Sequence, residues 1–191
     1  MPPSRRDDLI EASIEVFSKE GFRSVSVDRV LEVSGVSRMT LYNHFESKDD
    51  LMVTAFERWE ERSRAALRER VEAYPAAERP LAVFDIYATT QCATTGRVCL
   101  ALTAAIEYDD AACRMRELAA QHQESLVADL EGWLAGAGAG DPDLAIALLL
   151  LIQGALAATR AIGQLERASL RTEEIWSVAK GAAHRVIQRS G

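Results

Sequence analysis

Residues 26–45 read SVDRVLEVSGVSRMTLYNHF and predict two short helices joined by a tight turn. Ser26 and Ser37 each stand at the start of a helix, where a serine hydroxyl accepts a hydrogen bond from a backbone N–H of the first turn. Gly35-Val36 forms the turn, because glycine adopts left-handed backbone conformations at little cost. This arrangement is typical of a helix-turn-helix, whose second helix enters the major groove of DNA.

The second helix of the motif is predicted to have one buried and one exposed face. Its buried face, together with Val36 of the turn, packs against the first helix through Leu41 and Phe45. Residues four positions apart share a face of a helix, so 38 with 42 and 39 with 43 lie on the opposite side. That side is free to meet DNA and carries Arg38, Met39, Tyr42 and Asn43.

Helix start and stop signals continue along the whole chain, and no alternating strand pattern interrupts them. Ser4 begins a first helix that Gly21 ends, and Ser47 begins a long helix that runs toward Pro75. We therefore expect an all-α fold of about nine helices, with a three-helix DNA-binding domain at 1–47 and a helical bundle at 48–191. The remaining helices are expected from Pro80, over Val98–Tyr108, over Ala111–Ala135, from Asp141-Pro142 and from Thr172.

Composition limits the classes of function. The chain has 191 residues, 48% of them hydrophobic and 27% charged, which indicates a globular protein. Three cysteines without a CxxC pair and the absence of a signal peptide favour the cytoplasm. The longest apolar run, Leu144 to Thr159, has 16 residues, fewer than the ~20 that cross a bilayer, so we expect no membrane span.

Charge is the main objection to a DNA-binding function. The net charge is −7, and residues 101–150 hold 2 basic and 9 acidic side chains. A nucleic-acid-binding protein usually has a basic balance. Contact with double-stranded DNA would therefore depend on a few cations placed locally, and residues 34–48 have Arg38 and Lys48 against Glu46.

The segment resembles the tetracycline-repressor (TetR) family of bacterial transcription regulators. The resemblance covers roughly residues 9–56, about a quarter of the chain. Beyond it, the likeness is one of architecture only. It is carried by Gly21-Phe22, Ser26-Val27, Gly35-Val36-Ser37, Thr40-Leu41-Tyr42-Asn43-His44-Phe45, Ser47-Lys48 and Leu51.

The resemblance implies roles for individual residues of the motif. Ser26 and Ser37 would offer hydroxyl and N–H groups to phosphates, and Lys48 would bind a phosphate at the start of the fourth helix. Thr40, Tyr42 and His44 match positions that hold the sugar-phosphate backbone. The competing interpretation is that Tyr42 and His44 only cover the helix surface and that Lys48 is a solvated lysine.

Two positions of the exposed face are candidates for reading bases. Arg38 is the best of them, because a guanidinium matches guanine O6 and N7 in bidentate fashion. Met39 stands where the family commonly has glycine, and its side chain would touch a thymine methyl group. The operator sequence therefore cannot be copied from a relative.

In this family the C-terminal helices form a homodimer and enclose a ligand pocket. The sequence supports pairing independently, because Leu144–Thr159 is apolar around most of its circumference. Packing the last two helices against a second copy would give a four-helix interface, whereas the alternative is an ordinary monomer core. The last helix places a stripe on one face: Ile175, Ala179, Ala182, Ala183, Val186 and Ile187.

A pocket for a small, largely apolar effector is predicted from the same resemblance. Its candidate residues combine aromatic rings with a few polar groups, although a stripe of aromatics is also typical of a plain core. The acidic excess of residues 101–150 would suit a cationic amphiphile or belong to a solvated surface. The candidates are Trp59, Phe84, Tyr87, Cys92, Cys99, Thr103, Tyr108 and Trp133.

Other functions have weaker support. Cys92 and Cys99 would form a redox switch only if they are not simply small buried hydrophobes. The three histidines are far apart in sequence, so no metal site is expected, and no cofactor or catalytic motif is found. The sequence predicts a non-enzymatic DNA-binding regulator, namely a ligand-responsive repressor acting as a homodimer on a palindromic operator. The alternative is a DNA-organising or scaffolding protein of the same fold.

Overall fold

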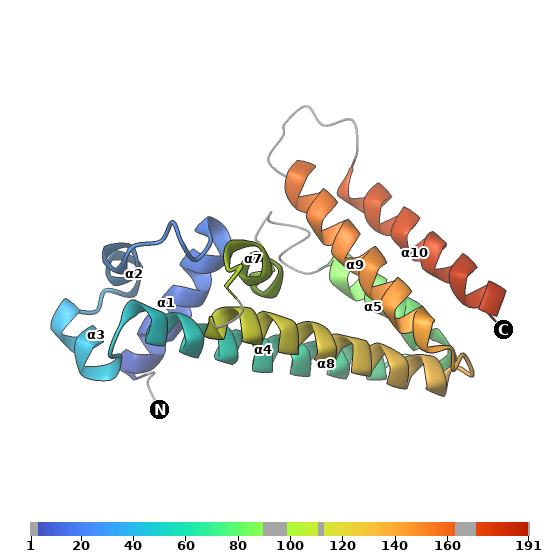
Figure 1. Cartoon of the computed structure of the whole chain (residues 1–191), viewed down its shortest axis with the longest axis horizontal. Coiled ribbons are helices and arrows are strands. Elements are labelled where there is room, and N and C mark those ends of the chain that lie inside the picture. Colours follow the sequence, from blue (N-terminus) through green and yellow to red (C-terminus); the bar gives the residue numbers. More distant parts are fainter. Residues whose placement is uncertain (1–3, 90–98, 111–112, 163–170, 191) are drawn as a thin grey trace. The chain divides into compact units, whose positions relative to one another are not determined.

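The structure is a computed structural model that describes residues 4–89, 99–110, 113–162 and 171–190. Across these ranges it has nine α-helices, one short 3-10 helix and no strand, so the all-α prediction is confirmed (Figure 1). The elements are α1 (Arg5–Glu20), α2 (Val27–Ser34), α3 (Arg38–His44), α4 (Lys48–Glu72), η1 (Ala76–Glu78), α5 (Arg79–Ala88), α7 (Leu100–Glu107), α8 (Arg114–Gly136), α9 (Pro142–Ile162) and α10 (Thr172–Ser190).

The chain divides into two compact units. The first, called the head unit below, comprises Met1–Ser63 and Val98–His122. The second, called the bundle unit, comprises Arg64–Arg97 and Gln123–Gly191. Helices α4 and α8 contribute residues to both units. The predicted domains, 1–47 and 48–191, follow the helix-turn-helix motif, and they remain a prediction.

Serine caps begin the first three helices of the head unit, as the sequence predicts. The hydroxyl of Ser4 accepts from the N–H of Asp7 at 3.2 Å, and that of Ser26 accepts from the N–H of Arg29 at 3.2 Å. Each such cap stabilises its helix by about 1 kcal/mol, because it satisfies an N–H that has no partner within the helix. Gly35 ends α2 in the left-handed conformation, with φ 65°.

Aromatic rings form the core of the head unit. Phe22, which follows the end of α1, is fully buried and has its ring centroid 5.0 Å from that of Phe17 and 6.5 Å from that of Phe56. The ring of Tyr108 meets Phe22 edge-on at 6.1 Å. Burying a phenyl group of this size contributes about 1.5–3 kcal/mol. The cluster therefore fixes the turn after α1 against α4 and the end of α7.

In the bundle unit α10 packs beside both α9 and α5 (Figure 1). Trp176 of α10 stacks on Tyr87 of α5, with ring centroids 6.0 Å apart. Three residues of the stripe that the sequence predicts for the last helix are buried inside this unit: Ile175, Ala179 and Ala183. That part of the stripe is therefore core within one chain.

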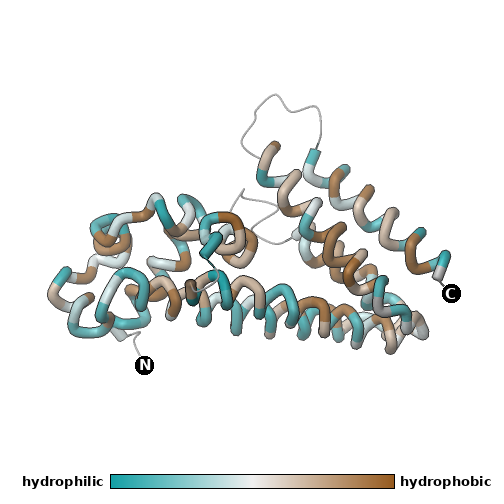
Figure 2. The backbone as a smooth tube through the Cα atoms, in the orientation of Figure 1, coloured by the Kyte–Doolittle hydropathy of each residue, from teal (hydrophilic) through white to brown (hydrophobic). Residues whose placement is uncertain are grey.

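Helix α9 is unusually apolar, and Figure 2 shows hydrophobic residues along its length. By length and composition alone, Asp143–Ile162 would be able to cross a membrane. Leu148 and Ile152 are fully buried within the bundle unit. On another face of the same helix Ile146 and Leu150 are exposed, by 49% and 66%. One face of α9 is thus core and another lacks a cover within the described chain.

Candidate nucleic-acid interface

Helix α3 is held by its inner face, as predicted. Leu41 is fully buried, and Phe45 and Val36 are 2% and 5% exposed. The helix starts at Ser37, whose hydroxyl accepts from the N–H of Thr40 at 3.1 Å. The side chain of Arg6 lies 5.2 Å over the Phe45 ring. Packing and cap together fix the orientation of this seven-residue helix.

The outer face of α3 is open to solvent. Met39 is 75% exposed and Tyr42 is 50% exposed, and Arg38, Asn43 and His44 are exposed as well. This arrangement agrees with the predicted face, whereas contact of these residues with DNA stays a prediction. The face presents a guanidinium, a phenol, an amide, an imidazole and one thioether. These groups cover the hydrogen-bond donors, acceptors and apolar contacts used for reading base edges.

Arg38 is paired across the turn with Asp28 of α2. Both side chains are largely exposed, so the pair is worth at most about 1 kcal/mol and can be exchanged for a base or phosphate. The carboxylate nevertheless holds the guanidinium on the α2 side of α3. Asp28 was not among the sequence-predicted site residues, and its acidic charge gave no signal for such a role.

The hydroxyl groups of the motif have structural partners. Ser26 and Ser37 cap α2 and α3, so their oxygens accept backbone N–H groups. The hydroxyls of Ser37 and Thr40 also lie 2.8 Å apart. A capping hydroxyl keeps its own O–H for donation. Ser26 and Ser37 therefore cap a helix through their oxygens, and one of the Ser37 and Thr40 hydroxyls donates to the other.

Lys48 is more firmly placed than a solvated lysine would be. It is the first residue of α4, and its Nζ donates to the backbone carbonyl of Phe22 at 3.0 Å. An ammonium has three N–H donors, so the other two stay available to a phosphate. Lys48 thus connects α4 to the turn between α1 and α2.

The other arginines near the motif are largely neutralised by ion pairs. Arg29 donates hydrogen bonds to the carboxylates of Glu32 and Glu20, and these bonds raise the pKa of its guanidinium. Arg5 pairs with Asp8 at 3.6 Å. Because these arginines are paired with acidic side chains, few cations near the motif stay available to DNA phosphates.

The predicted effector residues are divided between the two units. Trp59, Cys99, Thr103 and Tyr108 belong to the head unit, and Cys92 lies outside the described residues. Thr103 is buried and its hydroxyl donates to the carbonyl of Cys99 at 3.0 Å, while Trp59 packs on Phe56 at 5.5 Å. The members in the bundle unit are Phe84, Tyr87 and Trp133. Their role in ligand binding stays a prediction.

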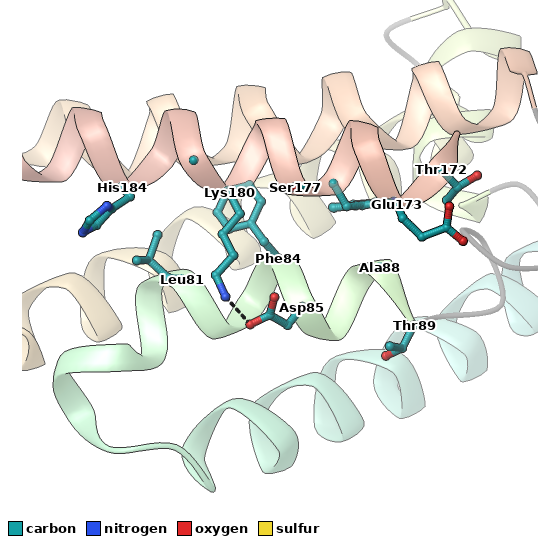
Figure 3. A pocket seen from close by; sticks show the side chains of 12 residues that line it. Leu81, Phe84, Asp85, Ala88, Thr89, Thr172, Glu173, Ser177, Lys180 and His184 are labelled. Atoms are coloured by element: carbon teal, nitrogen blue, oxygen red, sulfur yellow. Dashed lines mark hydrogen bonds and ion pairs between the residues drawn. The ribbon is translucent and has the colours of Figure 1, made fainter. Parts of the chain in front are cut away.

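A groove of about 890 Å³ lies in the bundle unit between α5 and α10 (Figure 3). Phe84 and Trp176 contribute apolar lining, and Asp85 and Lys180 form an ion pair across it at 2.5 Å. The indole N–H of Trp176 is buried without a hydrogen-bond partner among the described residues. Of the seven predicted effector residues that the structure describes, only Phe84 is among those that line this groove.

Neither a thiol site nor a metal site emerges from the described part of the chain. Cys99 and Cys113 are free, and burial raises the pKa of the Cys99 thiol. A raised pKa lowers the fraction of reactive thiolate. Within the same residues no three His, Cys, Asp or Glu side chains are grouped as metal ligands.

Comparisons with known proteins agree on one family. The model described as "Bacterial regulatory proteins, tetR family" matches residues 9–55. The transcriptional regulator TcmR of Streptomyces glaucescens is 34% identical over 76 residues, which are 40% of this chain and 32% of that protein. UidR of Escherichia coli (strain K12), also a transcriptional regulator, is 36% identical over 67 residues, 35% of this chain and 34% of that protein. The matches span about a third of these curated relatives.

Solved structures extend the similarity to the whole fold. A TetR-family transcriptional regulator from Streptomyces coelicolor is similar over 100% of this chain and 91% of that chain, with a TM-score of 0.87 and 26% identity. A putative TetR-type regulator from Streptomyces avermitilis covers 95% of this chain and 99% of its own, with a TM-score of 0.71 and 26% identity. The described helices therefore have the order and packing of these regulators.

Proposed function

We propose that this chain, which belongs to the tetR family of bacterial regulatory proteins, represses transcription as a homodimer bound to a palindromic DNA operator. The observation that carries the proposal is the outer face of α3, which is rigidly mounted yet open, with Arg38 and Tyr42 exposed. A non-enzymatic, cytoplasmic role follows from this mode of action.

The DNA contact is divided into positioning and reading. Lys48, Tyr42 and His44 hold phosphates and sugars, and these contacts fix the register of α3 in the major groove. Arg38 reads a guanine when it leaves Asp28, with about 1–3 kcal/mol of discrimination. Met39 adds an apolar contact that favours thymine. A few cations in an acidic protein give specific binding with a weak non-specific background.

Pairing of two copies is supported by the uncovered faces of α9 and α10. Ile146 and Leu150 are 49% and 66% exposed on α9, and Val178 is 68% exposed on α10. Gly154 and Ala157 continue the α9 face and are small enough for close helix contact. Covering apolar surface of this kind against a second copy stabilises a dimer. A two-fold dimer then matches two half-sites one helical turn apart, about 34 Å.

Repression is proposed to be released by a small, largely apolar effector. The groove between α5 and α10 supports a site of mixed lining, with Leu81, Phe84 and Trp176 as its apolar part and the ion pair of Asp85 and Lys180 as part of its polar side. The other polar side chains that line it are Thr89, Thr172, Glu173, Ser177 and His184. A few polar groups within an apolar lining are typical of ligand sites. The test is loss of the protein–DNA complex when a panel of hydrophobic compounds is added.

Selection of binding sites from a random duplex library tests the DNA-binding part. A palindromic motif, with an affinity that falls as salt rises, is the expected result. Broad binding without a motif would instead favour the DNA-organising alternative. Failure to bind any duplex, with or without the compound panel, would contradict the proposal altogether.

A further inference from the structure

Glu107, the last residue of α7, holds the turn between α1 and α2. Its Oε2 atom accepts hydrogen bonds from the backbone N–H groups of Phe22 and Arg23, both at 2.9 Å. The donors are 85 and 84 residues away in the sequence, yet both belong to the head unit. Hydrogen bonds to an ionised carboxylate are about twice as strong as those between neutral groups.

Gly21 makes room for this carboxylate. Its φ is 83°, in the region that favours glycine, and a Cβ atom at this position would lie 2.3 Å from Oε1 of Glu107. A side chain here would displace the carboxylate or change the turn. The turn and Glu107 therefore fit one another only through a glycine.

The same turn is held from its other side by α4. The carbonyl of Phe22 accepts from Nζ of Lys48 at 3.0 Å, while its N–H donates to Glu107 at 2.9 Å. One residue is thus fixed at both backbone polar groups, and its ring is fully buried. Four residues further along, Ser26 caps the start of α2.

We propose that Glu107 is a positioning residue for DNA binding, which acts through the turn at Phe22 on Lys48 and on the start of α2. The inference rests on the proposed function. The two hydrogen bonds from Phe22 and Arg23 to Glu107 are called the clasp below. When the clasp is lost, the turn samples more conformations. Binding to DNA must then restrict the turn to one conformation, and this ordering reduces the binding free energy. Glu107 itself touches no DNA in this account.

The sign of the expected effect separates the proposal from simple electrostatics. Removing an acidic charge from a protein with net charge −7 should strengthen its attraction to phosphates. The clasp predicts the opposite, a loss of affinity of about tenfold for Glu107→Ala. The two explanations therefore give opposite results for the same variant.

Three variants at Glu107 distinguish hydrogen bonding from charge. Glu107→Gln keeps one acceptor oxygen, which both N–H groups can share because they donate to the same atom, but it loses the charge that strengthens the bonds. Glu107→Asp keeps the charge on a side chain that is one methylene shorter. Glu107→Ala removes both the acceptor oxygens and the charge. Glu117→Ala is the matched control, because Glu117 is an exposed acid of the same unit that pairs with Arg114 on the surface.

The first measurement needs no DNA. Hydrogen exchange of the Phe22 and Arg23 amides should accelerate in the Ala and Asp variants, and should accelerate less in Glu107→Gln, which keeps a neutral acceptor. Circular dichroism and thermal unfolding define the temperature at which all variants are folded. Unchanged amide exchange in Glu107→Ala would overturn the clasp.

The second measurement is affinity for a fixed random-sequence duplex and for the palindrome recovered by selection. We expect Glu107→Ala and Glu107→Asp to bind both about tenfold more weakly. Glu107→Gln, which keeps the acceptor but loses the charge, should bind between the wild type and Glu107→Ala, and Glu117→Ala should bind no more weakly than the wild type. If the wild type binds DNA, two results would overturn the inference. One is a wild-type affinity of Glu107→Ala, and the other is a loss of affinity in Glu107→Gln as large as that in Glu107→Ala. Absence of binding by the wild type would instead contradict the proposed function.

Discussion

Helices α2 and α3 and helices α9 and α10 expose opposite chemistry. The first pair presents Arg38, Tyr42 and Asn43 to solvent, with Met39 and Val33 as apolar exceptions. The second pair presents Leu150 and other apolar side chains. A polar face is stable in water and keeps its partners exchangeable, whereas an apolar face gains free energy only when it is covered. The difference is consistent with the proposal that the first pair contacts DNA reversibly and the second pair binds a second copy.

The largest effect is expected from a charge on the α9 face. Leu150→Glu places a carboxylate where two copies would bury it, so dimers should dissociate in sedimentation experiments. Affinity for the palindrome should fall about 10²–10⁴-fold, because two linked half-site contacts become independent. Ala120→Glu, at an exposed position of α8, is the control. If Leu150→Glu remains a dimer, the pairing surface does not include this face of α9.

A smaller effect is expected from Arg38. Arg38→Ala should cost about 1–3 kcal/mol against the preferred base pair at one position of each half-site, and should relax selection there. Repeating the library selection with the variant measures this change. Arg38→Lys keeps the charge without the bidentate geometry and should relax the same position. If both variants select the same DNA motif as the wild type, Arg38 does not contact a base.

Lys48 tests the positioning contacts. Lys48→Ala should weaken binding to all sequences alike and lower the slope of log affinity against log salt by about 0.9. Tyr42→Phe removes an uncharged hydroxyl and should weaken binding without a change in slope. Titrating DNA with each variant at several salt concentrations measures the two slopes. Equal slopes for Lys48→Ala and the wild type would contradict the phosphate contact.

The smallest effect concerns Tyr108, which supports the turn that Glu107 holds. Burial, followed by the charge of Glu107, raises the pKa of Tyr108 to about 12 from its usual 10.0. The neutral phenol is thus favoured in the folded state, and its contribution to stability is present below pH 10 and lost as pH rises toward about 12. Tyrosinate absorbance of the wild type minus Tyr108→Phe measures the titration. A midpoint near pH 10 would place Tyr108 in solvent.

The two helix pairs also differ in what their sequences predict. The caps at Ser26 and Ser37 and the turn at Gly35 are local signals, so the motif and its exposed face were predictable. For α10, the spacing of apolar residues alone cannot distinguish a stripe that packs on a second copy from one that packs within the same chain. Ile175, Ala179 and Ala183 are buried within the chain, so this part of the stripe agrees with the monomer-core alternative, while pairing through α9 and α10 stays a prediction.

Interactions outside the local caps and the turn are not predictable from the sequence. Glu107 belongs to the acidic excess of residues 101–150, yet its partners are backbone N–H groups about 85 residues away, which every residue except proline offers. Asp28 pairs with Arg38 through a turn whose geometry sets the contact. A single sequence carries no signal for either pair. Packing of the chain determines both.

The most direct test of the account is the mass of the complex on the palindrome that selection recovers. Sedimentation of the wild type with this duplex should give two chains per duplex, with half-site centres about 34 Å apart along the DNA. Leu150→Glu should bind as a single chain, weakly, to one half-site. A wild-type complex with one chain on a non-palindromic site would contradict the claim that α9 and α10 join two α3 surfaces.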